Sequence, residues 1–431
     1  MLDGGSARWR GDCPRSIQKA PGPRGSAALA PPGAMLRKTP FHERTAPLSL
    51  GQNWRRWAGF TVASSYELSH DREYFAIRNS AALLDVSPLF KYHVSGRDAA
   101  RLLDRVVTRD VAKSKVGQVL YTPWCDADGK VIDDGTIARL GEQSFRMTSA
   151  EPNYRWLGDN ARRLEVSIED VSDRIASLAL QGPNARSILE QATQQDLTSV
   201  KYFRLASAAI RGRPVTITRT GYTGDLGYEI WMDAADAIPV WDALIESGTP
   251  YGITPCGILA LDVARIEAGL LLLDVDYVST RHALIEPQKS SPLELSLDWT
   301  VSFDKPQFNG RNPIHAERKR GPEWKFVGVE VDWVSLETLF TSLGLAPRLP
   351  TQAWRTSVPL YDANGAVQVG YATSGCWSPI LKRYLTLAHL ESRYAEPGTP
   401  LTIEVTVEHR RQRALATVRS LPFFNPERKR A

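Results

Sequence analysis

The segment "TGYTGDLGYEIWM" at residues 220–232 combines three glycines with an aromatic-rich run. Glycines at 221, 224 and 227 have a spacing close to that of loops that hold a nucleotide phosphate. Such a loop requires a helix directly after it, because the helix N-terminus holds the phosphate. Here "YEIWM" alternates like a strand, so the sequence predicts a glycine-rich hairpin rather than a phosphate site.

The strand after the glycines predicts a ligand site. Alternate residues of a strand face opposite sides, which places Glu229 and Trp231 opposite an apolar trio. The trio consists of Tyr228, Ile230 and Met232. If the trio faces the core, a planar ligand with paired N–H donors, such as a pteridine, would satisfy the carboxylate. A glutamate that faces solvent is the alternative interpretation.

Composition limits the class of protein. The chain has 431 residues, of which 42% are hydrophobic and 23% charged, as in a globular protein of two or three domains. The net charge of +5 falls largely on residues 1–34, so no nucleic-acid partner is expected. No apolar run is long enough to span a bilayer, so no membrane partner is expected either.

The cysteines predict no metal site. Cys13, Cys125, Cys256 and Cys376 form no C-x-x-C pair and have no histidine at zinc-finger spacing. Zinc and disulfide chemistry are therefore not expected. We expect free thiols in a reducing compartment, and hence a cytoplasmic protein.

The pattern along the chain predicts an α+β protein with three folded parts. Residues 1–34 are rich in Gly, Ala, Pro and Arg and predict a disordered N-terminal extension. Strand–turn–helix units with antiparallel strands occur twice, which predicts two similar α+β halves at 35–170 and 171–322. Short strands at 323–425 predict a C-terminal antiparallel β-barrel, with an insertion at 334–357.

Hydrophobic periodicity and turn residues locate individual elements. A hairpin is expected at 117–140, around an Asp-Ala-Asp-Gly turn. Helices are expected at 71–87, 96–107, 234–248 and 256–269.

The motifs, taken together, resemble one known family. "GYTGDLGYEI" at 221–230, followed by "CGILALDVARIEAG" at 256–269, resembles the aminomethyltransferase (glycine-cleavage T-protein) family and its tetrahydrofolate-dependent demethylase relatives. Further matches occur in the same order between about residues 38 and 424, among them "WAGF", "GKVIDDGTIARL", "SLDWTVSF" and "ATSGCWSP". The resemblance implies a three-domain fold around a central folate channel. It also implies a transferase of one-carbon metabolism, with tetrahydrofolate as co-substrate.

The resemblance implies roles for two carboxylates. Asp134, the second aspartate of "IDD", is implied to be catalytic, because a carboxylate beside the transferred group stabilises positive charge or accepts a proton. The alternative is that Asp133 and Asp134 only end a strand, with Asp133 structural in either case. Glu229 is implied to bind the pterin ring, in agreement with the strand pattern.

Three further side chains are implied to bind the cofactor. Tyr121 and Tyr222 are implied to line the folate cleft, and Arg265 is implied to contribute to the same site. A packed core aromatic is the alternative for each tyrosine, and for Trp299 of "SLDWTV".

Departures from the family pattern leave the one-carbon donor open. Leu261 stands where the family has a ligand-contacting arginine, and an aliphatic side chain forms no charged hydrogen bond. The donor is therefore either a small methylated compound or an aminomethyl group on a lipoyl carrier protein. A non-catalytic folate-binding protein of the same fold, such as an iron–sulfur assembly or regulatory factor, is the alternative. That class relies on a reactive cysteine, and neither Cys256 nor Cys376 lies in a matching motif.

Overall fold

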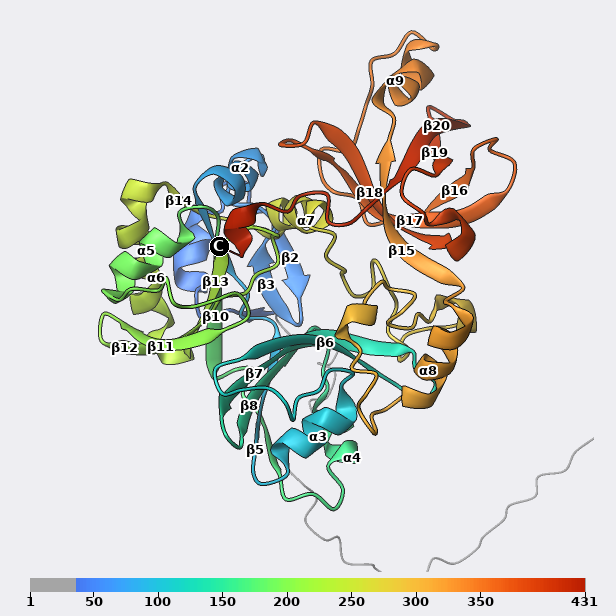
Figure 1. The fold of residues 1–431 in the computed structure, drawn as a ribbon. Helices are drawn as coiled ribbons and strands as arrows, with labels where there is room; N and C mark the ends of the chain where they lie inside the picture. Colours follow the sequence, from blue (N-terminus) through green and yellow to red (C-terminus); the bar gives the residue numbers. More distant parts are fainter. Residues whose placement is uncertain (1–35, 431) are drawn as a thin grey trace, which may run out of the picture. The chain divides into compact units, whose positions relative to one another are not determined.

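The computed structural model describes residues 36–430, and from Arg37 onward the chain forms one compact unit. The extension expected at 1–34 lies outside the described residues. Within residues 36–430 the strands form three open sheets and a closed barrel (Figure 1). A small sheet near the start of this unit has the strand order β1 (Arg37–Lys38), β3 (Phe60–Ala63), β2 (Trp54–Trp57).

A five-stranded antiparallel sheet forms the core of the first half. Its strands, in spatial order, are β6 (Val119–Cys125), β7 (Val131–Gly141), β8 (Ser144–Ser149), β5 (Phe90–Ser95) and β9 (Ser167–Asp170). Two helices, α3 (Ala99–Val106) and α4 (Tyr154–Asn160), pack against its apolar outer face (Figure 1). Strands β6 and β7 are the two strands of the hairpin expected at 117–140.

A six-stranded sheet forms the core of the second half. Its strands, in spatial order, are β11 (Leu205–Ile210), β12 (Arg213–Thr218), β13 (Gly227–Asp233), β10 (Ile175–Gln181), β4 (Ala81–Asp85) and β14 (Ile253–Pro255). Helices α5 (Ala185–Thr193) and α6 (Ala237–Gly248) cover its outer face (Figure 1). All neighbouring strands are antiparallel except β4 and β14.

The C-terminal part is the closed antiparallel barrel expected from the sequence. Its strands, in spatial order, are β15 (Trp324–Val331), β18 (Arg383–Glu391), β17 (Gln368–Ser378), β16 (Val358–Asp362), β19 (Pro400–Val407) and β20 (Arg410–Arg419). The insertion carries α9 (Trp333–Thr341), which packs on β20. Helix α8 (Arg311–Arg320) precedes the barrel.

Two central helices connect these parts. Helix α2 (Asp71–Asn79) packs on α7 (Ile258–Glu267), and α7 also contacts β17 of the barrel. The remaining helix, α1 (His42–Thr45), is a single turn beside α6.

The helix expected at 71–87 is wrong in its second half. Helix α2 ends at Asn79, and residues 81–85 form β4, which lies between β10 and β14 in the six-stranded sheet. Residues 81–84 are all buried and apolar. A short strand buried on both faces shows no alternation, so periodicity cannot distinguish it from a continuing helix.

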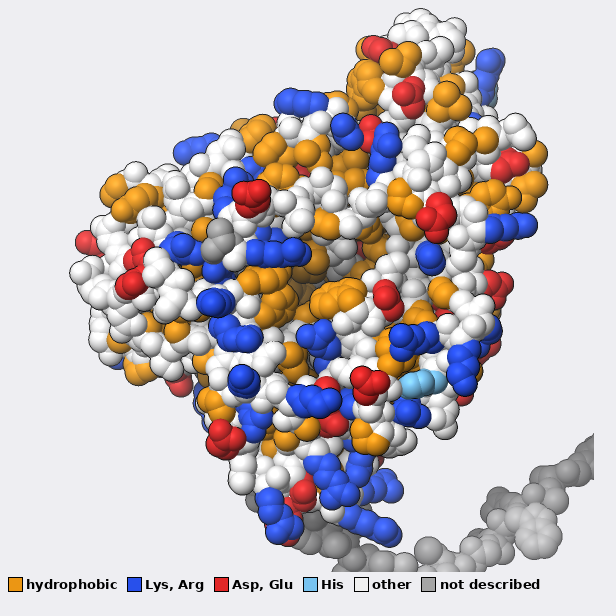
Figure 2. All heavy atoms as spheres, in the orientation of Figure 1, with side chains coloured by type: hydrophobic (Ala, Val, Ile, Leu, Met, Phe, Trp, Pro, Cys, Tyr) orange, Lys and Arg blue, Asp and Glu red, His pale blue; other side chains and the backbone are white. Residues whose placement is uncertain are grey.

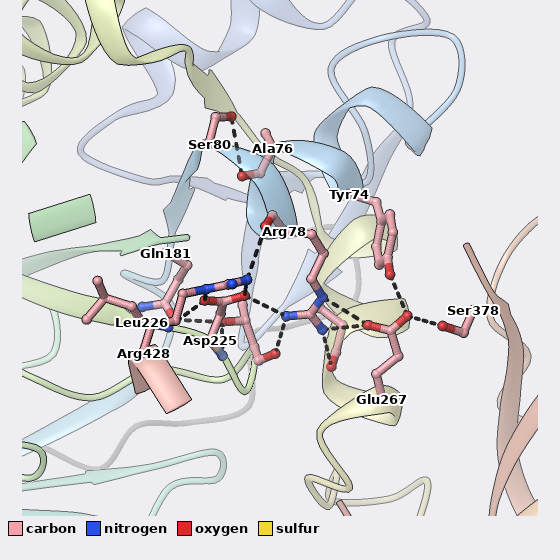
Figure 3. A network of polar contacts seen from close by, with 12 residues as sticks. Tyr74, Ala76, Arg78, Ser80, Gln181, Asp225, Leu226, Glu267, Ser378 and Arg428 are labelled. Atoms are coloured by element: carbon pink, nitrogen blue, oxygen red, sulfur yellow. Dashed lines mark hydrogen bonds and ion pairs between the residues drawn. The ribbon is translucent and has the colours of Figure 1, made fainter. Parts of the chain in front are cut away.

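A buried ionic network joins the helices, the glycine segment and the barrel (Figure 3). Arg78 of α2 donates from Nε and Nη2 to Glu267 Oε2 at 3.0 and 2.6 Å, and its Nη1 lies 3.5 Å from Asp225 Oδ2. Glu267 Oε1 accepts hydrogen bonds from the hydroxyls of Tyr74 and Ser378, both at 2.5 Å. The Arg78, Asp225 and Glu267 side chains are fully buried, so each depends on its partners for charge compensation.

The chain's C-terminal segment completes this network. Arg428 donates from Nε and Nη2 to the two carboxylate oxygens of Asp225, at 2.7 and 2.8 Å. The ring of Phe424 lies 4.2 Å from the Arg78 guanidinium carbon, and its backbone N–H donates to the carbonyl of Glu267 at 2.8 Å. The segment after the barrel therefore returns to α2, α7 and the glycine segment.

We expect Glu267→Gln to destabilise the fold strongly, because it leaves the buried Arg78 guanidinium without a full countercharge. Loss of one partner from a buried ion pair costs about 3–5 kcal/mol in the free energy of unfolding. Chemical denaturation followed by circular dichroism measures the change. The control is Glu165→Gln, which removes an exposed ion pair with Arg97 at 2.9 Å and is expected to cost about 1 kcal/mol or less. Equal losses in the two variants would contradict the role of the network.

Candidate functional site

The inner face of the five-stranded sheet carries polar side chains. Asp134 and Thr136 alternate along β7 and therefore share one face. Tyr121 pairs with Thr136, and Arg146 pairs with Ala138, so both side chains lie on that same face. The opposite face packs with α3 and α4 in an apolar core. Polar groups are thus concentrated on the face turned away from these helices.

The six-stranded sheet has the same division. Glu229 and Trp231 of β13 share a face with Ala179 and Thr218 of the neighbouring strands, as the pairing register shows. The apolar trio Tyr228, Ile230 and Met232 is buried on the other face, among α5 and α6. The expectation from the alternating pattern is therefore confirmed.

The glycine segment is a tight loop between the paired strands β12 and β13, as expected. It wraps around Gln181, whose Nε2 donates to the carbonyls of Thr220 and Tyr228 at 3.2 and 3.4 Å. A Cβ atom at Gly227 would lie 2.2 Å from Gln181 Oε1, and one at Gly221 would lie 2.0 Å from it. A side chain at either glycine would displace the Gln181 amide and its hydrogen bonds, so the glycines allow this close packing.

Asp134 is held by two phenols. Tyr121 Oη donates to Asp134 Oδ2 at 2.8 Å, and Tyr277 Oη donates to Asp134 Oδ1. Burial raises the pKa of the Asp134 carboxyl, whereas the hydrogen bonds from Tyr277 and Tyr121 lower it. The ring of Trp299 stacks on Tyr121 with centroids 5.9 Å apart, which supports the position of that phenol.

Asp133 has a different environment, although it is the next residue. Its side chain is buried and accepts hydrogen bonds from the backbone N–H groups of Asp134 and Glu151 and from Asn153 Nδ2, at 2.8–3.0 Å. Burial and the neighbouring Asp134 charge raise the pKa of Asp133 well above its usual range. These contacts give Asp133 a structural role, because they connect β7 to the loop that contains Glu151 and Asn153.

Glu229 is held by two threonine hydroxyls. Thr220 donates to Glu229 Oε2 at 2.6 Å, and Thr218 donates to the same oxygen at 3.4 Å. Burial raises the pKa of the Glu229 carboxyl, while the Thr220 hydroxyl and the charge of Arg146 lower it. Because both recorded hydrogen bonds reach Oε2, Oε1 is the oxygen left for a ligand donor.

Tyr222 and Arg265 are both engaged with the segment that follows α7. The Tyr222 hydroxyl donates to the carbonyl of Leu271, so its ring, not its hydroxyl, is left for a ligand. Arg265 is buried in an ion pair with Asp276, and burial raises the pKa of the Tyr222 phenol while the Arg265 charge lowers it. Leu261 faces a small cavity that it shares with Cys256.

Tyr277 is a residue that sequence reasoning missed. It follows α7 in a loop and lies 143 residues from Asp134 in the chain, yet it donates to that carboxylate. A lone tyrosine in a loop has no periodic pattern around it. The sequence carries no signal for this residue, because its contact with Asp134 arises only in the folded chain.

The visible face of the molecule is hollowed. Figure 2 shows a depression in the middle of the visible face, in the region that Figure 1 places among β6, β13 and α7. Apolar side chains line it, and Lys and Arg side chains gather at its rim. An apolar hollow with positive charge at its rim suits a flat ligand with an anionic tail.

Cys125, Cys256 and Cys376 are free thiols, as expected, whereas Cys13 lies outside the described residues. Burial raises the pKa of the Cys256 and Cys376 thiols well above the usual range, which disfavours the reactive thiolate form. No helix within residues 36–430 has the length and apolar character needed to cross a membrane.

Comparisons with known proteins identify the family of this chain. Residues 42–305 match the GCVT N-terminal domain, and residues 343–425 match the glycine cleavage T-protein C-terminal barrel domain. The aminomethyltransferase of Halothermothrix orenii is 35% identical over 395 residues, which cover 90% of this chain and 100% of that protein. The aminomethyltransferase of Thermoanaerobacter sp. strain X514 is 33% identical over 387 residues, covering 88% and 96%.

A solved structure shows the same fold. The glycine cleavage system aminomethyltransferase T from Bartonella henselae superimposes with a TM-score of 0.76 at 24% identity, over 91% of this chain and 99% of that one. Together, the fold and the relatives define a transferase that uses tetrahydrofolate as co-substrate. The chain belongs to the aminomethyltransferase, or glycine-cleavage T-protein, family.

We expect Tyr277→Phe to move the acidic limb of the pH–rate profile to higher pH. A hydrogen bond to an ionised carboxylate lowers its pKa, so loss of the Tyr277 phenol raises the pKa of Asp134. The carboxylate then becomes protonated, and activity falls, at a higher pH than in the unmodified protein. The dependence of kcat on pH measures this shift.

The matched control is Tyr361→Phe. It also removes a phenol that donates to a carboxylate, Glu404 at 3.2 Å, but it lies in the barrel. This variant is expected to keep the original profile. An unshifted profile in Tyr277→Phe would contradict the role of the phenol pair.

Proposed function

We propose that this chain moves a one-carbon unit from a small methylated or aminomethyl donor to tetrahydrofolate. The observation that carries this proposal is the Asp134 carboxylate, which two phenols hold on the inner face of its sheet. A carboxylate in a partly desolvated site interacts more strongly with developing positive charge than it would in water.

Asp134 is the proposed catalytic residue. Tetrahydrofolate, when bound, supplies an amine that accepts the one-carbon unit. The Asp134 carboxylate stabilises positive charge on the reacting nitrogen, or accepts its proton, within hydrogen-bond reach. Tyr121 and Tyr277 keep the carboxylate oriented and favour its ionised form.

Glu229 is the proposed pterin anchor. Its Oε2 accepts from Thr220 at 2.6 Å and from Thr218 at 3.4 Å, and its Oε1 is the freer oxygen. The paired N–H groups of a pterin edge would bind one to each carboxylate oxygen. Tyr121 and Tyr222 form walls of the folate cleft. Arg265 contributes positive charge to the proposed folate site and is held in place by its ion pair with Asp276.

The donor is proposed from the sequence, in which Leu261 stands where the family has a ligand-contacting arginine. Leu261 offers no charged hydrogen bond, which favours a small N-, O- or S-methylated compound over an anionic one. An aminomethyl group carried by a lipoyl carrier protein is the other donor of the proposal, and that protein is then the partner. We place the reaction in the cytoplasm. The folate-binding halves are assigned to 35–170 and 171–322, and the barrel domain to 323–425. Strand β4 of the first range lies in the sheet of the second half, so the two halves exchange this strand.

The decisive experiment incubates the protein with tetrahydrofolate and a panel of donors. The panel contains methylated amines, methyl ethers, sulfonium compounds and an aminomethyl-lipoyl carrier protein, and mass spectrometry detects methyl- or methylene-tetrahydrofolate. We expect product with at least one donor, and a loss of roughly 100-fold or more in kcat for Asp134→Asn. Asp128→Asn, an exposed aspartate on the same hairpin, is the control and should retain activity.

Binding separates the transferase from a non-catalytic folate-binding protein. Titration with tetrahydrofolate should show saturable binding that Glu229→Gln weakens. Binding without product from any donor would favour the non-catalytic alternative. Undiminished product from Asp134→Asn would contradict the assignment of the catalytic residue.

A further inference from the structure

Arg146 of β8 is a cation that the proposed reaction leaves unused. Arg146 is 7% exposed. Its pairing with Ala138 of β7 places its side chain on the inner face of the sheet, together with Asp134 and Thr136. Among the described residues it takes part in no recorded hydrogen bond or ion pair. Its guanidinium carbon lies 4.1 Å from the ring centroid of Trp231, in a cation–π contact. The contact leaves the in-plane N–H donors of the guanidinium available.

Trp231 connects Arg146 to the Glu229 site. Trp231 and Glu229 lie two residues apart on the same face of β13. The indole Nε1 donates to Thr218 Oγ1 at 3.1 Å, and Thr218 also contacts the Glu229 carboxylate. The indole is thus fixed by the same hydroxyl that supports Glu229, so the guanidinium stacked on it lies beside that carboxylate.

The charge state of Arg146 suits a ligand contact. Burial lowers the pKa of Arg146 to about 10, and the charge of Glu229 opposes this effect. The side chain therefore remains cationic at neutral pH, with five N–H donors in a planar fork. Its N–H groups have no hydrogen bond to the described residues, so they are available to a ligand that brings an acceptor to this position.

The chemistry of a pterin supplies that acceptor. When a carboxylate accepts from the ring N3–H and the 2-amino group, the adjacent 4-oxo oxygen projects beside the same carboxylate. We propose that Arg146, held on Trp231, donates to the 4-oxo oxygen of the bound pterin and makes the site select 4-oxo over 4-amino pteridines. This inference rests on the proposed function, because it takes Glu229 as the pterin anchor.

Selectivity follows from the absence of an acceptor on the guanidinium. A 4-amino group presents donors where the 4-oxo group presents an acceptor, so two sets of N–H groups would face each other. A site whose buried donor is left unpaired discriminates strongly between such analogues.

The test compares the binding of tetrahydrofolate with that of its reduced 4-amino analogue, by calorimetric titration of the full chain. We expect Arg146→Met to weaken tetrahydrofolate binding by about 10- to 100-fold, the usual range for a hydrogen bond to a charged group. The preference for the 4-oxo ligand should fall by a similar factor. Arg101→Met, on the exposed surface of α3, is the matched control and should change neither quantity.

A second variant gives an independent result. Arg146→Gln places an amide that both donates and accepts, so we expect it to remove the preference while keeping part of the affinity. If circular dichroism shows that Arg146→Met does not fold, Arg146→Gln alone tests the proposed contact with the 4-oxo oxygen. Unchanged affinity and unchanged preference in either folded variant would overturn the inference.

The outcomes also separate this inference from the proposed function. If the unmodified protein binds tetrahydrofolate and Glu229→Gln weakens it, but Arg146 variants do not, only the role of Arg146 is wrong. If the unmodified protein fails to bind tetrahydrofolate, the proposed function fails and the inference with it.

Discussion

The buried pair of Arg78 and Glu267 determines how the parts of this protein meet. Arg78 lies on α2 and Glu267 ends α7, and their network extends to Asp225 of the glycine segment and to Ser378 of the barrel (Figure 3). Fully buried charges demand nearly complete compensation, so the elements that carry them have little freedom to shift. The glycine segment, and the strand that follows it, are thereby held at a fixed position relative to α7.

The two carboxylates of the proposed site have different supports. Asp134 is held by phenols, one of which, Tyr277, comes from the loop after α7. Glu229 is held by threonine hydroxyls on β12 and the adjoining loop, with the Arg146 charge opposite. Both carboxyls are desolvated, which raises their pKa, and in both the hydrogen bonds lower it again. These different supports agree with the two roles proposed above, one beside the reacting group and the other in recognition of a ring.

Period-2 alternation and turn chemistry predicted the parts of the site that are local in sequence. These parts are the face of β13 that carries Glu229 and the hairpin that carries Asp134. Outside the site, the same patterns predicted the strands of the barrel. Strand β4 was mistaken for helix because its burial on both faces removes the alternation. Tyr277 and Arg146 were missed because their partners are brought near only by pairing between distant strands and loops, which no local pattern records.

The most direct test of this arrangement is a crystal structure of the protein with a bound reduced folate. We expect the N3–H and 2-amino edge of the pterin within about 3 Å of Glu229. We also expect the reactive nitrogens of the ligand to face Asp134, between Tyr121 and Tyr222. A folate bound away from Glu229, or one whose reactive nitrogens point away from Asp134, would contradict the assignment of the site.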